Sequence, residues 1–314
     1  MKSPARRLIS VVTGCYNEED NVRELSRRIE AVFADLPAYD FEHILIDNAS
    51  TDGTQQILRQ LAKENPKTKV IINTRNFGHI RSPYHGMLQG SGDAVIAMAS
   101  DLQDPPELIP EFLREWEQGF KVVMGVKTQS SESPIMFAIR KLYYGLSGKL
   151  SEIRLVSNFT GFGLYDRIVI DQLREIDDPY PYFRGLVADL GYDAATIPFT
   201  QPRRKRGITK NNFFTLYDIA MLGVTNHSKV PLRVATMAGF LLSAISLCIA
   251  IGYLVAKIFF WSKFAMGTAP ILIGFFFFMS VQLFFIGMIG EYVGSIHTQV
   301  LKRPHVIEKE RLNF

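Results

Sequence analysis

Residues 41–54 read FEHILIDNASTDGT, and the architecture of the chain can be worked out from this stretch. It opens with a short apolar run, Phe41–Asp47, of the kind that forms a β-strand. Polar, turn-forming residues follow the run. Ile57, Leu58 and Leu61 then recur at helical spacing. The stretch therefore predicts a strand, a polar loop and an amphipathic helix, in that order.

The same alternation continues on both sides of this unit. Further strands are predicted at Leu8–Thr13, Lys69–Asn73, Ala94–Ala99 and Lys121–Gly125. Apolar residues at helical spacing separate them: Val22, Leu25, Ile29 and Val32 in one segment, and Leu108, Ile109, Phe112, Leu113 and Trp116 in another. Alternating strands and helices predict an α/β fold with a mostly parallel, Rossmann-like sheet covered by helices on both faces. Such sheets bind ligands at the carboxyl ends of their strands.

Two runs near the C-terminal end carry no charged residue. The first spans residues 234–256 and the second residues 264–290. At 1.5 Å per residue the first run is about 35 Å long as a helix, enough to cross a hydrocarbon core of about 30 Å. The alternative, two buried helices of a soluble protein, is disfavoured because core helices rarely stay uncharged over such lengths. The runs predict a hairpin of two transmembrane helices.

Charged residues around this hairpin predict its orientation. The cytoplasmic ends of membrane helices carry an excess of Lys and Arg. Basic residues cluster at 203–210 and recur at Lys229, Arg233, Lys302 and Arg303, against Lys257 and Lys263 alone in the connector. Both ends of the hairpin are therefore expected in the cytoplasm. The mild net charge of +4 says little about partners, and two widely separated cysteines fit a reducing compartment.

Two aromatic-rich segments are too short or too polar to span a bilayer. Residues 135–150 and 212–224 are interpreted as helices lying on the membrane surface, although ordinary helices packed on the sheet remain an alternative. The expected organisation is a catalytic domain over residues 1–210, an interfacial helix over 211–229, two transmembrane helices over 230–296 and a cytoplasmic tail over 297–314.

Polar motifs follow the predicted strands. Thr13–Glu19 and Asp47–Thr54 end the first two strands and offer acceptors and donors for a ribose and a base, although Asn17, Ser50 and Thr51 would also serve as helix caps. Asp101 ends the fourth strand, with Gln103 and Asp104 nearby, where a carboxylate can hold a divalent cation against a diphosphate. Asp104–Glu107 also has the pattern of a helix start.

These motifs occur together and in this order, and at that point the chain resembles the family 2 glycosyltransferases of the GT-A fold. Within that family it is most similar to the polyprenyl-phosphate glycosyltransferases. The strings that carry the resemblance are Tyr16–Glu19, Asp47 with Ser50–Thr54, Asn76–His79, Asp101–Glu107, Phe183–Leu186 and the spacing of Arg203, Arg206 and Lys210. The resemblance covers essentially the whole chain, including the two apolar runs.

The resemblance implies a set of site residues. A nucleotide-sugar would contact Thr13, Tyr16, Asn17, Glu18, Asp47, Asn76, His79 and Ser100. Asp101, Arg206 and Asn158 would be catalytic, and Asp101 with Gln103 would hold Mg²⁺ or Mn²⁺. Phosphate and lipid would be held by Arg140, Arg203, Lys210, Phe213 and Phe214. The remaining histidines, His43, His85, His227, His297 and His305, lack ligand spacing and are expected to be structural or exposed.

The implied reaction is the transfer of a hexose, with glucose from UDP-glucose favoured, to undecaprenyl or another polyprenyl phosphate. The acceptor is a phosphate monoester that is largely dianionic at neutral pH, so it needs no strong general base and a single displacement would invert the anomeric centre. The expected location is the bacterial cytoplasmic membrane, with the catalytic domain and both termini inside. A homo-oligomer is a weaker expectation, and no nucleic acid partner is expected.

The chain departs from the usual family pattern at four places. Thr13 stands where a proline is usual, Asn48 replaces the second of two aspartates, Ala99 removes one carboxylate of an Asp-x-Asp pair, and Thr160–Leu164 lacks an acid and an arginine. Two alternatives stay open. A processive polysaccharide synthase would need more membrane helices and a Gln-x-x-Arg-Trp motif, and a non-catalytic membrane partner would fit the loss of the acids.

Overall fold

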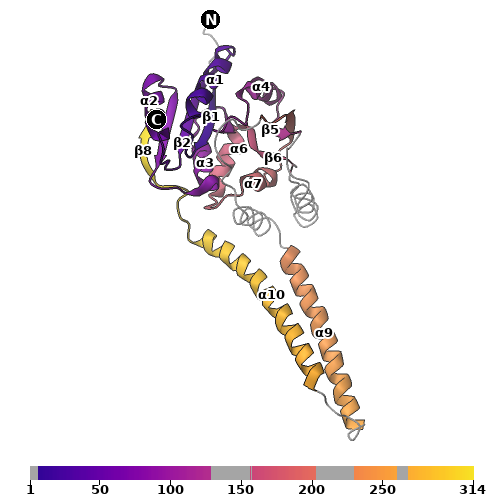
Figure 1. Ribbon diagram of the computed structural model, residues 1–314. Coiled ribbons are helices and arrows are strands. Elements are labelled where there is room, and N and C mark those ends of the chain that lie inside the picture. Colours follow the sequence, from indigo (N-terminus) through magenta and orange to yellow (C-terminus); the bar gives the residue numbers. More distant parts are fainter. Residues whose placement is uncertain (1–5, 129–155, 157, 203–229, 260–267) are drawn as a thin grey trace.

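The computed structural model describes residues 6–128, 156, 158–202, 230–259 and 268–314. Within these residues the chain forms one large sheet with helices on both faces, and two long helices that project from one side of it (Figure 1). The predicted interfacial segments at residues 135–150 and 212–224 lie outside the described residues. The predicted α/β class and the two apolar helices are both confirmed.

The sheet has eight described strands in the order β7-β5-β6-β4-β1-β2-β3-β8. Strands β1 to β4 are parallel, whereas β6 runs antiparallel to both β4 and β5, and β8 runs antiparallel to β3. All five predicted strands are present, and β6, β7 and β8 were not predicted. The bounds are β1 Arg7–Cys15, β2 Tyr39–Asp47, β3 Thr68–Asn73, β4 Ala94–Ala99, β5 Val122–Lys127, β6 Phe159–Asp166, β7 Ala194–Phe199 and β8 Glu308–Leu312.

Helices cover the two faces of the sheet in sets. One face is covered by α1 (Val22–Ala34), α2 (Thr54–Glu64) and α4 (Ile109–Glu117), and the other by α3 (Gly78–Gln89), α6 (Arg167–Ile176) and α7 (Phe183–Asp189). A short 3₁₀ turn, Pro106–Leu108, precedes α4. Each strand contributes buried side chains to the cores on both faces of the sheet, because successive residues of a strand point to opposite sides.

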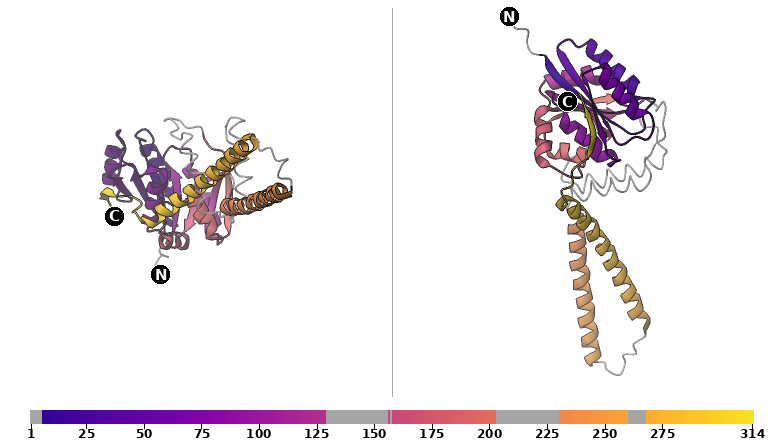
Figure 2. Two further views of the ribbon diagram at one scale, coloured as in Figure 1. Left: turned by 90° about the horizontal axis from the view of Figure 1, so that it is seen from below. Right: turned by 90° about the vertical axis from the view of Figure 1, so that its left-hand side faces the viewer.

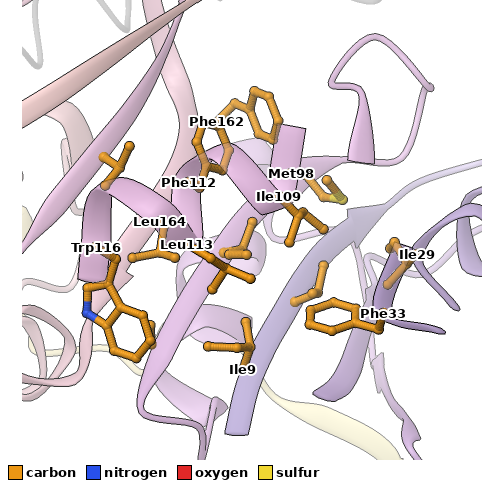
Figure 3. Close-up of a cluster of buried hydrophobic side chains, with 14 of the residues drawn as sticks. Ile9, Ile29, Phe33, Met98, Ile109, Phe112, Leu113, Trp116, Phe162 and Leu164 are labelled. Carbon is orange, nitrogen blue, oxygen red and sulfur yellow. The ribbon is translucent and has the colours of Figure 1, made fainter. Parts of the chain in front are cut away.

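The core on the first face is closely packed around aromatic side chains. Ile29 and Phe33 of α1 and Phe112 of α4 meet Ile9 of β1, and all are almost completely buried (Figure 3). The rings of Phe112 and Phe162 lie edge to face, with centroids 5.0 Å apart. Each fully buried side chain of this size contributes roughly 1.5–3 kcal/mol to folding. The periodicity of α1 and α4 in the sequence is therefore the imprint of this core.

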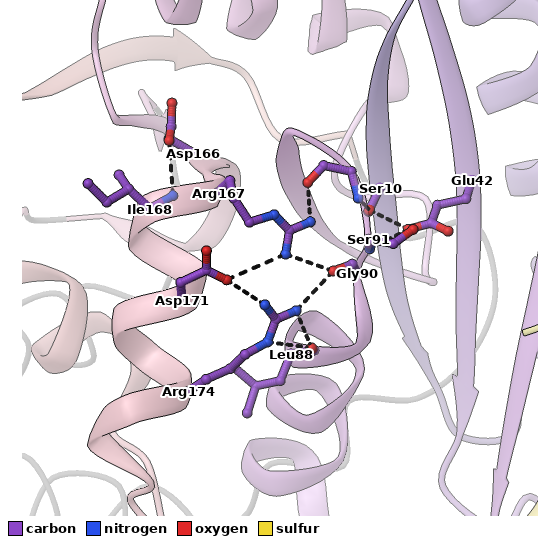
Figure 4. A network of polar contacts seen from close by, with 11 residues as sticks. Ser10, Glu42, Leu88, Gly90, Ser91, Asp166, Arg167, Ile168, Asp171 and Arg174 are labelled. Atoms are coloured by element: carbon purple, nitrogen blue, oxygen red, sulfur yellow. Dashed lines mark hydrogen bonds and ion pairs between the residues drawn. The ribbon is translucent and has the colours of Figure 1, made fainter.

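Polar contacts lock the opposite, amino-terminal edge of the central strands. Arg167 and Arg174 on α6 donate to the backbone carbonyl of Gly90, and Arg174 also donates to that of Leu88 (Figure 4). Beside them, buried Glu42 of β2 accepts from Ser10 Oγ at 2.5 Å and from Ser91 N at 2.6 Å. The second oxygen of Glu42 lies 2.6 Å from Lys69 Nζ. This network is far from the carboxyl ends of the parallel strands, so its role is structural.

Replacing Glu42 with glutamine is expected to lower the free energy of unfolding by about 2–4 kcal/mol, since a buried ion pair loses one partner. Burial disfavours the charged carboxylate, but hydrogen bonds from Lys69, Ser10 and Ser91 outweigh it and lower the pKa of Glu42. A lowered pKa gives stability above the pKa of the unfolded chain, near 4.5, and that stability is lost as pH falls through the folded value.

Thermal unfolding of the full chain in detergent, followed from neutral to acid pH, measures both effects. Wild type should lose stability in acid more steeply than the Glu42→Gln variant. Glu24 on α1 provides a control, because it is only half-buried, its partner Arg27 is exposed, and glutamine there should change little. Equal melting temperatures for the Glu42 and Glu24 variants would refute the structural role of Glu42.

The two long helices are apolar and uncovered. They are α9 (Val230–Phe259) and α10 (Thr268–Val300), and the most apolar stretch of each helix is not buried within the protein. At 1.5 Å per residue the 33 residues of α10 extend about 50 Å, more than a hydrocarbon core of about 30 Å requires. Both helices leave the sheet domain on the same side (Figures 1 and 2). Their exposure and length fit a bilayer, not a protein core.

The segment after α10 returns to the sheet domain, and residues 301–314 are called the C-terminal strap below. It was expected to be a tail beginning at residue 297, but α10 continues to Val300 and the strap contains β8. The backbone N–H of Thr74 donates to the carbonyl of Ile307 at 2.9 Å, and β8 then pairs with β3. Figure 2 shows this yellow strand along the sheet.

Side chains fasten the strap at several places. Arg59 of α2 holds Glu310 with two donors, its Nη2 at 2.7 Å and its Nε at 2.9 Å. His85 of α3 lies 2.7 Å from Glu308. His305 Nε2 lies 2.7 Å from the backbone oxygen of Asp178. Of the histidines predicted to be structural, His85 and His305 therefore join the membrane hairpin to the sheet domain.

Candidate active site

The predicted motifs meet along one edge of the sheet. Cys15 is the register partner of Asp47, Asp47 that of Ile72, and Gly14 that of Ala99. The carboxyl ends of β4, β1, β2 and β3 are therefore neighbours, and the polar loops that follow them lie side by side. This edge is the ligand-binding position of an open parallel sheet.

Close packing of α3 shapes the same edge. A side chain on Gly14 would place its Cβ 2.8 Å from Cγ of Pro83, so any larger residue would push α3 off β1. At the start of α3, Gly78 has a φ of +89°, a conformation that L side chains rarely adopt. These two glycines let the loop from β3 approach the end of β1.

The loops after β1 and β2 are tied to each other. Asn17, with a φ of +55°, donates from its backbone N–H to Ser50 Oγ at 2.8 Å, and its Oδ1 accepts from Thr51 N at 2.8 Å. Glu19 Oε2 accepts from Gly53 N at 2.6 Å. The helix-cap alternative for Asn17, Ser50 and Thr51 is wrong, because α1 is preceded by Asn21 and α2 by Gly53. These residues bridge two loops instead.

Asp47 is the buried acid of the edge, with no exposed surface. Its Oδ2 accepts from the backbone of Ser50 and from Gln55 Nε2, each at 3.0 Å. Its Oδ1 is buried and has no hydrogen-bond partner among the described residues. Burial raises the pKa of this carboxyl, opposed by the hydrogen bonds from Ser50 and Gln55. A buried acceptor without a donor is costly, so Oδ1 fits a donor group supplied by a ligand.

The hydrogen bonds of Asn48 explain why an asparagine stands where the family usually has a second aspartate. Its Nδ2 donates to Asn76 Oδ1 at 2.9 Å and to the carbonyl of Gly78 at 3.1 Å, while its Oδ1 accepts from Phe77 N at 2.8 Å. An aspartate could not make the two donations, so the amide is the group that holds the loop after β3 against the loop after β2. Asn76 and His79, both predicted to bind the nucleotide, are exposed on this loop.

Asp101 and Gln103 follow β4 and are both partly exposed. Asp101 Oδ1 accepts from Gln103 N at 3.2 Å, and Gln103 Nε2 reaches the carbonyl of Pro202 at 3.4 Å. Gln103 therefore touches the residue that directly precedes the basic segment at 203–210. Asp104 turns inward and accepts from Ala99 N at 2.9 Å, and burial raises its pKa to about 6.

The residues at the end of β4 fit a hard divalent cation. No group of three His, Cys, Asp or Glu side chains with metal-binding geometry is found in the described part of the chain. Mg²⁺ is commonly held by one or two carboxylates together with substrate phosphates, and such a site needs few protein ligands. Asp101 is the accessible carboxylate here, and Gln103 offers an amide oxygen beside it. Asp104, already used by the backbone, supports the loop.

Two predicted contacts are engaged in the interior. Thr13 is fully buried, with its Oγ1 3.2 Å from Nε2 of His43, so its hydroxyl does not line the edge and that prediction is corrected. Burial lowers the pKa of His43 to about 3, which keeps the ring neutral. Ser100 hydrogen-bonds the thiol of Cys15, whose pKa burial raises well above its usual range. Both serve to build the edge.

The other predicted residues lie at the same edge or outside the described chain. Glu18 is half-buried, with its carboxylate accepting from Asn21 Nδ2 at 2.6 Å, and Tyr16 is half-buried beside it. Asn158, with a φ of +62°, precedes β6, and its carbonyl accepts from Lys127 N at 3.4 Å. Arg140, Arg203, Arg206, Lys210, Phe213 and Phe214 lie outside the described residues.

Lys127 at the end of β5 is a residue that the sequence analysis missed. Its charge acts on buried Asp104 and opposes the rise in the pKa of that carboxyl. It therefore brings a cation to the carboxyl edge on the side away from Asp47. The only signal in the sequence was its place at the end of a predicted strand, which is too weak to single out one lysine.

The mostly parallel, mixed sheet with helices on both faces is that of the GT-A fold. The chain belongs to glycosyl transferase family 2, whose family model matches residues 10–173. The assignment as a transferase and the predicted family are confirmed.

Relatives match almost the full length. The chain is 32% identical to the uncharacterized glycosyltransferase sll0501 of Synechocystis, covering 94% of this chain and 93% of that protein. It is 30% identical to the SfII prophage-derived bactoprenol glucosyl transferase of Shigella flexneri, covering 96% and 97%. A solved mannosyltransferase, PcManGT of Pyrobaculum calidifontis, is 16% identical with a TM-score of 0.49, covering 95% and 88%, and adds nothing to the assignment.

Proposed function

We propose that this enzyme moves a hexose from a UDP-sugar to the phosphate of a polyprenyl lipid at the cytoplasmic face of a bacterial membrane. The observation that carries the proposal is that the carboxyl edge of the sheet, where the candidate site lies, is joined to a candidate membrane span. Thr74, beside the site loop, is bonded to the strap that continues α10. Relatives named bactoprenol glucosyl transferase support the lipid acceptor and glucose as the first sugar to test.

In the proposed reaction the donor binds along the carboxyl edge. Asp47 Oδ1 accepts from the nucleoside, and Asn48 keeps the Asn76–His79 loop closed over it. Asp101 and Gln103 would hold a divalent cation, and such a cation would supply charge neutralisation for the leaving diphosphate. Lys127 adds positive charge at the same edge. The basic segment 203–210, which begins after the Pro202 contact, would close on the phosphates.

The chemistry needs one displacement. An oxygen of the acceptor phosphate attacks the anomeric carbon, the bond from that carbon to the diphosphate oxygen breaks, and UDP leaves with the electron pair. The acceptor is already anionic, so no proton has to be removed. The anomeric centre is inverted. Positioning and charge neutralisation supply the rate, which accommodates the loss of acids at Ala99 and at Gly161–Leu164 in β6.

The membrane supplies the acceptor. Lys302 and Arg303 directly follow α10, and Arg233 lies near the start of α9, so the charged ends of both helices lie on the side of the sheet domain. By the rule that positive flanks stay inside, the domain and the strap would be cytoplasmic. Phe213 and Phe214 remain predicted guides for the prenyl chain, and uncovered helix surface leaves room for self-association.

The test is transfer by the purified full-length protein in lipid nanodiscs. Radiolabelled UDP-glucose, UDP-galactose, UDP-N-acetylglucosamine and GDP-mannose are each supplied with undecaprenyl phosphate, with EDTA or with added Mg²⁺ or Mn²⁺. We expect label from UDP-glucose to enter the lipid phase only when the acceptor and a cation are both present. Undecaprenol without phosphate is the matched control. Absence of lipid product with every donor would leave the non-catalytic alternative standing.

A further inference from the structure

Three arginines gather between the strap and the loop after β3. The guanidinium carbon of Arg75 lies 4.0 Å from the ring centroid of Phe77, and that of Arg81 lies 5.5 Å from the same centroid. Arg81 Nε donates to the carbonyl of Phe77 at 3.2 Å. The guanidinium groups of Arg75 and Arg81 therefore both lie near the ring of Phe77, and the backbone carbonyl of Phe77 also holds Arg81.

Arg303 of the strap belongs to the same group. His305, just beyond it, packs edge to face against Tyr84 of α3 with ring centroids 5.2 Å apart, which brings the strap onto the helix that carries Arg81. The positive charges of Arg75 and Arg303 both act on Arg81. Partial burial, followed by these two charges, lowers the pKa of its guanidinium. Arg75 and Arg303 therefore each lie near enough to Arg81 to disfavour its charged form.

Many arginines of the sheet domain have a carboxylate partner, whereas these three have none among the described residues. Arg28 pairs with Glu107, Arg59 with Glu310 and Arg174 with Asp171. In the described part of the chain, Arg75, Arg81 and Arg303 make no ion pair. Among the described residues, Arg75 Nη1 donates to the carbonyl of Asn76 at 3.1 Å, and Arg81 donates from its Nε alone. Within this part of the chain, most donors of the three guanidinium groups have no acceptor and can serve a ligand.

The place of the group indicates what the ligand is. Arg303 follows closely on Val300, where α10 ends, so one member stands where the chain leaves the candidate membrane span. The other two flank the Asn76–His79 loop, which Asn48 fastens to the nucleotide edge. An anion held here would lie between the membrane and the sugar donor. Guanidinium groups match phosphate oxygens in both geometry and charge.

We propose that Arg75, Arg81 and Arg303 form a binding site for the phosphate of the polyprenyl acceptor as it rises from the membrane toward the donor. The inference rests on the proposed function and assigns its acceptor phosphate to residues outside the basic segment 203–210. A dianionic phosphate would offset the repulsion that Arg75 and Arg303 exert on Arg81. The site needs no metal, because the positive charge comes from the protein.

The test replaces the arginines with glutamine, singly and together, in the full-length protein in zwitterionic nanodiscs. We expect the KM for undecaprenyl phosphate to rise about tenfold or more in Arg75→Gln/Arg81→Gln/Arg303→Gln, the effect of losing charged hydrogen bonds. The KM for the UDP-sugar should change less than about twofold. Lysine at the same three positions should restore part of the affinity. Arg27→Gln on α1 is the matched control, since Arg27 is an exposed arginine paired with Glu24.

A second measurement separates this site from the reaction itself. Native mass spectrometry of undecaprenyl phosphate retained by the protein reports binding even if no sugar is transferred. Retention should fall in the triple variant and persist in Arg27→Gln. The exposed Arg303→Gln alone should show part of the loss without a change in melting temperature, which guards against misfolding at half-buried Arg81. Unchanged retention of undecaprenyl phosphate in the triple variant overturns the proposal. A triple variant that keeps undecaprenyl phosphate and loses only bound phosphatidylglycerol also overturns it, because the site would then serve an ordinary lipid headgroup.

Discussion

Replacing Asp101 with alanine is expected to lower turnover about 10²- to 10³-fold, the range seen when one preorganised electrostatic group is removed from an active site. Asp101 is the accessible carboxylate after β4, and Ala99 leaves the loop without the partner acid that relatives of this family usually carry. The substitution removes the main protein ligand proposed for the cation. Donor binding in the presence of Mg²⁺ should weaken with it, while binding in EDTA should match that of wild type.

Glu107→Gln is the matched control for this experiment. Glu107 stands in the same acidic loop, but it is exposed and pairs with Arg28 on the outer side of the domain. Its loss should change turnover less than about twofold, since surface ion pairs contribute little. Full activity in Asp101→Ala, or an equal loss in both variants, would refute the assignment of Asp101.

Replacing Asp47 with alanine is expected to weaken binding of UDP about 10- to 100-fold, because a buried charged acceptor and its hydrogen bond to the ligand are lost together. The unsatisfied Oδ1 carries this prediction. Burial raises the pKa of Asp47, so its carboxyl takes up a proton at a higher pH than an exposed aspartate would. The affinity of wild type for UDP should therefore fall as the pH drops, over a window that lies above that of an ordinary aspartate.

Calorimetric titration with UDP, without acceptor, measures this affinity at each pH. Asp35→Asn, an exposed position after α1, is the control and should bind as wild type does. Asp47→Asn keeps the side-chain volume but can present a donor where an acceptor is required, so it should resemble the alanine variant. Wild-type affinity in Asp47→Ala would remove Asp47 from the donor site.

The part of the fold that could be predicted is the part with strong local patterns. Strands β1 to β5 are apolar runs, and α1 and α4 show the spacing of one buried face. Strand β6 contains Gly161 and Gly163, and β8 reads EKERL, with no apolar alternation. The pairing of β8 depends on backbone bonds to β3 and on Arg59, which is far away in the sequence. No local pattern could report such a contact.

The candidate site was predictable in its location but not in the roles of its members. Polar residues at successive strand ends had to meet at one edge, and they do. Which of them face a ligand depends on long-range partners. Asn17 is taken up by Ser50 and Thr51, and Thr13 by His43. The reason for Asn48 became visible only when its amide was found across from Asn76 and Gly78.

The C-terminal strap also has a consequence for how the protein is made. In chain order the strap comes after both long helices, yet its strand β8 covers the edge of β3 and its Val306 is buried. During synthesis the edge of β3 therefore stays unpaired until both long helices have left the ribosome. Open edges invite pairing with other chains. The sheet is thereby completed only after both long helices have been synthesised, and the sheet domain expressed without its helices and strap should accumulate as aggregates.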